Sequence, residues 1–233
     1  MSEKKVLLFG GGGCHDYKAV CPLLKKQLEN AGMSVEYVAE DFDALLFENL
    51  TRFDTVALYY TGGDLPLESK RGLVEWVAAG GGFAGVHCAA DSFKSSPEYL
   101  AMLGGVFQGH PFKRNYIVSL VGEKHPIIDG IEGYSVKDWE KWPVYEFPVH
   151  DEQYLIDVDS RVKVLATTVF RSRLWPVSWA KPWGQGRVFY LAIGHDVEAC
   201  SNAFFEKMFV NGVCWTAESE PMEVEKDAKF SIS

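Results

Sequence analysis

Residues 80–90, GGGFAGVHCAA, contain the junction that decides the fold. The apolar run 83–86 has the length of a buried strand in a parallel sheet, and glycines separate it from the helix before it. Small residues follow Val86, where the chain must turn sharply into the next element. This pattern is typical of an elbow that holds a reactive side chain at the edge of a sheet, and His87 and Cys88 are the candidates for that side chain.

The same pattern repeats before this junction. Short apolar runs predict strands, the first and third of which end at glycines, and apolar residues at helical spacing predict the helices between them. The predicted strands are 6–9, 35–38, 54–60 and 83–86, and the predicted helices begin near Val20 and at Pro66. Alternating strands and helices with glycine-marked loops indicate an α/β fold with a flavodoxin-like, doubly wound and mostly parallel sheet.

The second half of the chain is less regular. It predicts strands at 116–121, 162–168 and 187–193 and a closing helix at 203–215. No Pro-, Gly- or Ser-rich linker divides the chain, so we expect a single domain over residues 1–216. The charged, poorly periodic segment 217–233 is expected to be a loosely ordered tail.

Composition excludes several classes of function. The chain has 233 residues, 47% of them hydrophobic, and a net charge of -9, which disfavours nucleic acid and anionic membranes as partners. No apolar run of about 18 residues occurs in the sequence. The five cysteines show no CxxC spacing and are best explained as reduced thiols. The sequence therefore predicts a cytoplasmic protein without a nucleic-acid or membrane partner.

Three histidines follow predicted strands of the parallel sheet. His15 follows the first strand, His87 the fourth and His195 the last, so we expect all three at the carboxyl edge, where such sheets bind ligands. His110 and His150 lie in loops that can fold over this edge. Imidazoles suit a divalent metal ion such as zinc or manganese, with His87, His110 and His195 as the predicted ligands. The alternatives are histidines that only cap strand ends, or His195 as a general acid or base without metal.

Asp151 and Glu152 add carboxylates beside His150. Either could bind the metal or take a proton from a substrate carbon, and the alternative is a solvated turn. Asp16 has a similar ambiguity, because it can contact substrate or cap the first helix. The glycine run 10–13 lacks GxGxxG spacing and a Walker lysine, so no nucleotide cofactor is expected.

Several blocks in fixed order carry a family resemblance from about Val6 to Trp215. They are Gly80–His87, Leu103–Phe107 with His110-Pro111, His125-Pro126-Ile127, Asp151–Tyr154, Pro176–Trp179, Gly184–Tyr190 and Gly194-His195-Asp196. The chain resembles the ThuA-like, or trehalose-utilisation, family of the class I glutamine amidotransferase-like superfamily. The resemblance implies this superfamily's fold and a role in sugar metabolism, beside oxidoreductases that make 3-keto-glycosides.

The glutamine amidotransferases of this superfamily carry a Gly-x-Cys-x-Gly elbow. Aligning its first glycine with Gly85 places His87 at the tip and Cys88 one position later. A thiolate at Cys88 with His195 as its base is therefore the weaker interpretation, and a small buried side chain is the stronger one. We expect no glutamine amidotransferase activity.

These observations lead to a set of functional expectations. The main hypothesis is an enzyme that isomerises, eliminates or hydrolyses a small sugar or 3-keto-glycoside by proton transfer, with His87, His195, Asp151 and Glu152 as catalytic residues. The residues expected to bind substrate are His15, Asp16, His110, Tyr154 and Trp179. The rival is a non-catalytic sugar-binding or regulatory module, and a thiol hydrolase through Cys88 is the third hypothesis.

Tryptophans concentrate in the second half of the chain. The five are Trp139, Trp142, Trp175, Trp179 and Trp183. Aromatic rings can pack on the C–H faces of sugars, so this region could line a carbohydrate cleft. Alternatively, these side chains fill an irregular insert or form the contact of a homo-oligomer.

Overall fold

The structure is a computed structural model that describes residues 3–121, 124–131, 134–135 and 145–218. Trp139, Trp142 and nearly all of the predicted tail 217–233 lie outside these residues. The strands are β1 (Lys5–Gly12), β2 (Ser34–Ala39), β3 (Thr55–Thr61), β4 (Gly82–Val86), β5 (Gly105–Gly109), β6 (Arg114–Leu120), β7 (Tyr134–Ser135), β8 (Tyr145–Asp151), β9 (Leu155–Val158), β10 (Lys163–Phe170), β11 (Arg173–Trp183) and β12 (Gly186–Leu191). The α-helices are α1 (Tyr17–Asn30), α2 (Phe47–Leu50), α3 (Leu67–Ala78), α4 (Pro97–Leu103), α5 (Val197–Cys200) and α6 (Ala203–Thr216). Short 3-10 helices occupy Phe42–Leu45, His87–Asp91 and Pro126–Ile128.

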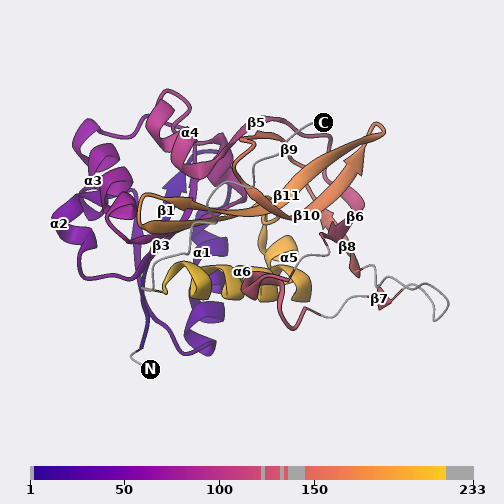
Figure 1. Cartoon of the computed structure of the whole chain (residues 1–233), viewed down its shortest axis with the longest axis horizontal. Coiled ribbons are helices and arrows are strands. Elements are labelled where there is room, and N and C mark those ends of the chain that lie inside the picture. Colours follow the sequence, from indigo (N-terminus) through magenta and orange to yellow (C-terminus); the bar gives the residue numbers. More distant parts are fainter. Residues whose placement is uncertain (1–2, 122–123, 132–133, 136–144, 219–233) are drawn as a thin grey trace, which may run out of the picture.

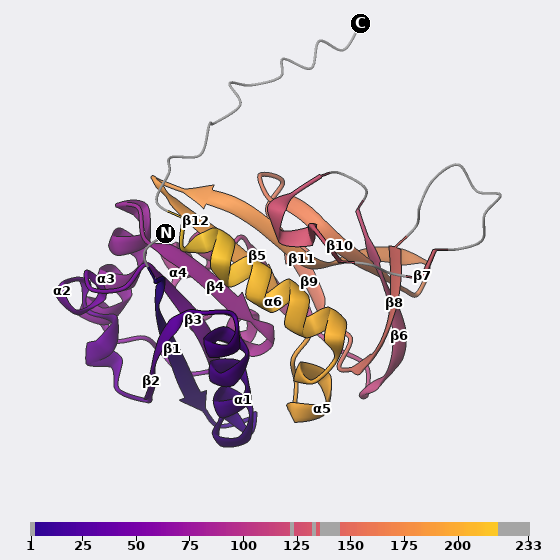
Figure 2. The same cartoon turned by 90° about the horizontal axis from the view of Figure 1, so that it is seen from below.

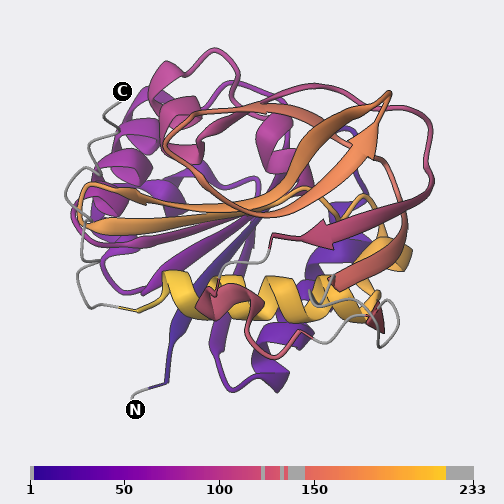
Figure 3. The ribbon, with the colours of Figure 1, turned by 45° about the vertical axis from the view of Figure 1, so that its right-hand side comes forward.

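A parallel sheet forms one half of the molecule and confirms the flavodoxin-like prediction. Its strand order is β2-β1-β3-β4-β12, with every neighbouring pair parallel. β3 and β12 are buried along their whole length, which explains why their sequences read as continuous apolar runs. Figure 3 shows α1 and α6 on one face of this sheet and α3 and α4 on the other. The doubly wound arrangement therefore brings the ends of β1, β4 and β12 to one edge.

Antiparallel strands extend the same sheet in the order β12-β11-β10-β6-β8-β7 (Figures 1 and 2). The long strand β11 was not predicted from the sequence, because Pro176 and Pro182 interrupt its pattern and prolines cannot donate to a ladder. A separate pair, β5 and β9, packs near β11. This half carries β8 and the loop after it, which deliver Asp151 and Glu152 to the parallel edge.

Gly186 is the first residue of β12 and lies very close to the backbone of neighbouring segments. A Cβ there would overlap the backbone carbonyl oxygens of Val77 and Gly81, which cannot move as a flexible side chain can. We expect Gly186→Ala to destabilise the fold by roughly 3 kcal/mol. Gly13→Ala is the matched control, because nothing lies within 4 Å of a Cβ at that position. Chemical denaturation of both variants measures the difference, and an equally stable Gly186→Ala protein would contradict this packing.

Candidate metal centre

His87 sits at the tip of the elbow, as the register of the sequence predicted. β4 ends at Val86, and His87 follows with a φ of 41°, a left-handed conformation that is rare for a residue other than glycine. Its side chain is 0% exposed, and its Nδ1 donates to the carbonyl oxygen of Ala192 at 2.6 Å. Such backbone strain persists where the surrounding structure holds it, and it concentrates at functional sites.

The other two strand-end histidines meet His87, which confirms their predicted placement. His15 follows β1, and its ring centroid lies 4.9 Å from that of His87. His195 follows β12, and its ring lies 5.0 Å from His15 and 5.7 Å from His87. Tyr59 fixes the His195 loop, because its hydroxyl donates to the carbonyl oxygens of Gly194 and His195 at 2.9 and 3.0 Å.

Glu152 supplies a carboxylate at the centre of these rings. Its Oε2 lies 3.1 Å from Nδ1 of His195, 3.5 Å from Nε2 of His87 and 3.5 Å from Nε2 of His110. One ligand atom each from His15, His87, His195 and Glu152 lies within 4.8 Å of all the others. Three imidazole nitrogens and one carboxylate oxygen therefore converge closely enough to bind one metal ion. His15 and Glu152 join the predicted ligands His87 and His195 in this set, whereas His110, the third predicted ligand, is not part of it.

The hydrogen bonds around the rings leave the converging nitrogens free to bind. Because Nδ1 of His87 donates to a carbonyl oxygen, its Nε2 carries a lone pair. Nδ1 of His15 is similarly occupied, by the Thr61 hydroxyl at 2.6 Å. Within the described residues, Nε2 of His15, Nε2 of His87 and Nδ1 of His195 are buried and make no well-aligned hydrogen bond, and the last two face the Glu152 carboxylate. Buried polar atoms without partners are unfavourable, and outer hydrogen bonds that fix the tautomer accompany metal-binding histidines, so this donor set fits a divalent ion.

The charges of the cluster depend on one another. Burial, followed by the neighbouring His87 and His195, lowers the pKa of His15 to about 3. The contact with Glu152 raises the pKa of His195 above its usual value. Burial alone would raise the pKa of Glu152, but the contacts with His195 and His87 outweigh it and lower this pKa. The cluster is therefore held together by attraction between one carboxylate and the rings, and His15 stays neutral and able to bind.

Asp151 lies beside the cluster but does not open into it. It is 0% exposed, and its carboxylate accepts from the backbone N–H groups of Gly194 at 2.7 Å, Glu152 at 2.8 Å and His195 at 3.3 Å. With both oxygens engaged, Asp151 is placed to join the two loops that carry Glu152 and His195. The expectation that it takes a proton from substrate is therefore corrected to a positioning role.

Of the remaining predicted site residues, Tyr154 and His110 lie at the cluster, whereas Asp16 and Trp179 do not. Tyr154 lies against the cluster, with its ring 3.9 Å from His87 and 5.5 Å from His110, which is partly exposed. Asp16 caps α1 by accepting from the N–H of Ala19, which is the alternative that the sequence left open. Trp179 is buried in the core, stacked on Tyr190, so its expected contact with substrate is wrong.

Two supporting residues were missed by the sequence analysis. Thr61 ends β3 and holds His15, and the rule that placed the histidines at strand ends could have found it. Phe107, whose ring lies 4.4 Å from Tyr154, comes from the separate β5–β9 pair, and no sequence pattern placed that pair beside the cluster.

Cys88 is a core residue. Its side chain is completely buried, and this burial raises the pKa of its thiol well above the usual value. We expect Cys88→Ala to keep the wild-type metal content and sugar binding, with a loss of stability of about 1 kcal/mol from the vacated space. Metal analysis measures the metal content, and calorimetry measures sugar binding and stability. A glutaminase assay should be negative. Glutamine hydrolysis that disappears in Cys88→Ala would contradict this assignment.

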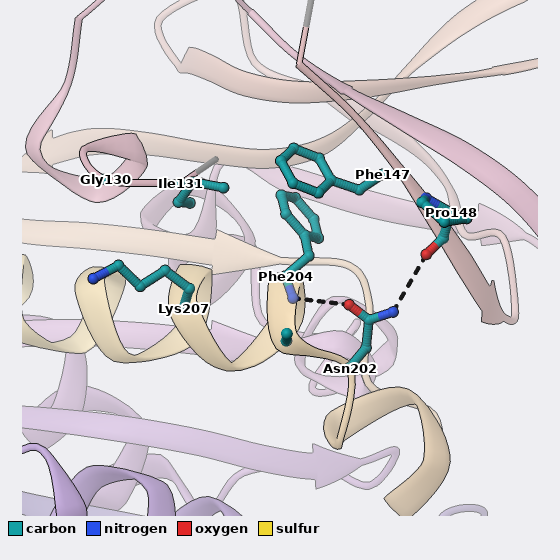
Figure 4. Close-up of a pocket in the computed structure, with 8 residues that line it drawn as sticks. Gly130, Ile131, Phe147, Pro148, Asn202, Phe204 and Lys207 are labelled. Atoms are coloured by element: carbon teal, nitrogen blue, oxygen red, sulfur yellow. Dashed lines mark hydrogen bonds between the residues drawn. The ribbon is translucent and has the colours of Figure 1, made fainter. Parts of the chain in front are cut away.

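Two hollows on another part of the surface do not belong to this centre. Figure 4 shows one, of about 370 Å³, between β8 and α6, where Asn202 joins Phe204 to Pro148 and the rings of Phe147 and Phe204 stack. The other, of about 650 Å³, surrounds His125, whose Nδ1 accepts from the N–H of Ile127. Burial lowers the pKa of His125 to about 4. Neither hollow contains a converging set of acids and histidines among the described residues, so His125 is a structural cap.

Comparison with known proteins gives a consistent family and fold. The sequence model of the ThuA family, described as trehalose utilisation, matches residues 5–216. The fold is similar to that of a ThuA-like protein from Parabacteroides merdae, with a TM-score of 0.77, 20% identity and coverage of 96% of this chain and 93% of that one. A ThuA-like protein from Bacteroides uniformis gives a TM-score of 0.71 at 20% identity, with 91% of each chain covered.

A more distant structure shares the fold as part of a larger chain. The β-galactosidase from Rahnella sp. R3 gives a TM-score of 0.61 at 16% identity, covering 94% of this chain but 32% of that enzyme. No curated protein matches the sequence significantly. No helix among the described residues is long and apolar enough to cross a membrane.

Proposed function

Because this chain belongs to the ThuA, or trehalose-utilisation, family, we propose that it is a metal-dependent enzyme that acts on a small sugar or 3-keto-glycoside by proton transfer. The observation that carries the proposal is the convergence of three buried imidazole nitrogens, none with a well-aligned hydrogen bond, around the Glu152 carboxylate. His15, His87, His195 and Glu152 would hold the metal, which is zinc or manganese from the chemistry of these donors. A divalent ion there supplies Lewis-acid stabilisation of negative charge on a substrate oxygen.

His110 is the residue best placed to move the proton. Its Nδ1 donates to the carbonyl oxygen of Pro111 at 2.9 Å, so in the neutral ring Nε2 is the nitrogen that can accept a proton. This Nε2 lies 3.5 Å from Oε2 of Glu152, and the side chain is 33% exposed, so a substrate can reach it. The ring stacks on Tyr154, which fixes its plane beside the cluster.

The chemistry follows from a ketone next to a C–H bond. The ketone acidifies this C–H, and Nε2 of His110 takes the proton while the electron pair of the broken bond moves toward the carbonyl oxygen as an enolate. Return of the proton to a different carbon gives isomerisation, and loss of a neighbouring leaving group gives elimination. Asp151 contributes by fixing Glu152 and His195 through their backbone N–H groups.

Deuterium exchange tests the proposal directly. The metal-loaded protein is incubated in D₂O with a 3-keto-glucoside, and proton NMR follows the C–H signals beside the ketone. We expect exchange that the protein accelerates and that chelation or His110→Ala removes. Sugar binding without accelerated exchange or turnover would instead support the non-catalytic sugar-binding module.

A further inference from the structure

The segment from His110 to Lys113 joins β5 to β6 and lies on the side of the metal centre where the His110 side chain is 33% exposed, which we call the mouth of the centre. At one end, His110 contacts Glu152. At the other end, Nζ of Lys113 donates to Oδ2 of Asp196, the residue after His195, at 2.6 Å. Three residue steps span at most about 11 Å, so the residues between these anchors stay close to the mouth. Figure 2 shows the start of β6 and helix α5 close together on the lower side of the view.

Phe112 lies between the two anchors and is 96% exposed, the most exposed of the large hydrophobic side chains described. Leaving a phenyl ring in water forgoes roughly 1.5–3 kcal/mol of burial free energy. An aromatic ring offers a flat apolar face, and the C–H face of a sugar ring is a matching flat surface. Its position beside the cluster distinguishes Phe112 from exposed apolar residues elsewhere, such as Leu174.

A network of polar groups begins at the next residue, Lys113. Lys113 also donates to Oε2 of Glu198 at 2.7 Å, and Nδ1 of His150 lies 3.0 Å from Oε1 of the same carboxylate. The side chains of Lys113, Glu198 and His150 are 24%, 64% and 44% exposed, so they keep capacity for further hydrogen bonds. A flat apolar face beside fixed donors and acceptors is the combination that a sugar ring with its hydroxyls requires.

We propose that Phe112, with Lys113, Glu198 and His150, forms a second sugar subsite at the mouth of the metal centre. The inference rests on the proposed function, and it names the substrate class. The substrate is a disaccharide or similar glycoside, whose reacting ring enters the cluster while its second ring lies on Phe112. Phe112 is then a specificity-determining residue rather than a part of the proton-transfer machinery.

Calorimetry with trehalose and glucose as probes tests the subsite on the metal-loaded full chain. We expect trehalose to bind about tenfold more tightly than glucose, the value of one aromatic contact. Phe112→Ala should remove this preference and Phe112→Trp should retain it, while Leu174→Ala, a matched exposed apolar residue on β11, should leave it unchanged.

Two outcomes would overturn the subsite: no preference for trehalose in the wild type, including no binding of either sugar, or an unchanged preference in Phe112→Ala. Metal content, measured on the same samples, distinguishes a failure of the subsite from a failure of the proposed function. A wild type that binds metal but shows no preference refutes the subsite alone. A wild type that binds no metal refutes the metal-dependent enzyme, while the comparison of the two sugars still decides the subsite.

Discussion

His87→Ala is expected to lower metal affinity by more than about 100-fold, beyond the 10–100-fold that loss of an outer-shell partner costs. The structure supplies the reason, since Nε2 of His87 is buried in the middle of the cluster and makes no well-aligned hydrogen bond there. His195→Ala should have a similar effect, and the double variant should lose little more than either single variant, because residues that act as a unit fail together. Equilibrium dialysis against zinc or manganese measures all three affinities.

His125→Ala is the matched control for this cycle. His125 is also partly buried and hydrogen-bonded, but it caps the 3-10 helix Pro126–Ile128 away from the cluster. The His125→Ala variant should be somewhat less stable than the wild type and should bind metal with the wild-type affinity. Thermal unfolding of each variant tells loss of the site from loss of the fold. Wild-type metal affinity and activity in both His87→Ala and His195→Ala would contradict the site, and unfolding of both would mean that these histidines only tie strand ends together.

Metal addition should stabilise the metal-free protein strongly. An ion at about 100 times its Kd adds about 2.7 kcal/mol to the free energy of unfolding. For a domain of this size, about 2–4 °C of Tm accompany each kcal/mol, so we expect the Tm to rise by about 5–10 °C. Differential scanning calorimetry with zinc and with manganese measures the shift. His87→Ala should show almost none, and an equal shift in that variant would place the binding elsewhere.

The shift in Tm should depend on pH. Glu152 raises the pKa of His195 in the metal-free protein, and the proton that His195 then holds must leave before its Nδ1 can bind metal. Below this raised pKa the proton competes with the ion, and above it the ring is neutral. The stabilisation should therefore be complete above the raised pKa of His195 and should shrink as the pH falls through it. A shift that grew on acidification would contradict binding through imidazole.

The parallel half of the fold was predictable because its strands are buried on both faces. Runs such as Val6–Phe9 and Phe83–Val86 carry no polar interruption, and glycines mark the turn after the first run and the turn before the second. The antiparallel half was harder. β11 contains two prolines, and β5 and β9 pair with each other across about 50 residues of chain. Pairing over such a separation is set by tertiary packing, which a local pattern does not encode.

The residues of the metal centre also divide into those that the sequence could place and those that it could not. His15, His87 and His195 could be placed because the topology of a parallel sheet brings strand ends together. Glu152 was a candidate, but nothing in the sequence distinguished it from Asp151. The difference lies in direction, since Asp151 turns inward to three backbone N–H groups and Glu152 turns toward the rings. Trp179 was misplaced for a related reason, because burial in the core does not follow from residue type.

Elemental analysis of the full chain, purified without a histidine tag and dialysed against excess zinc or manganese, tests the metal centre most directly. The four converging ligands of His15, His87, His195 and Glu152 predict about one tightly held ion per chain. His87→Ala treated in the same way should retain almost none. A wild type that holds no more metal than His87→Ala would contradict the account.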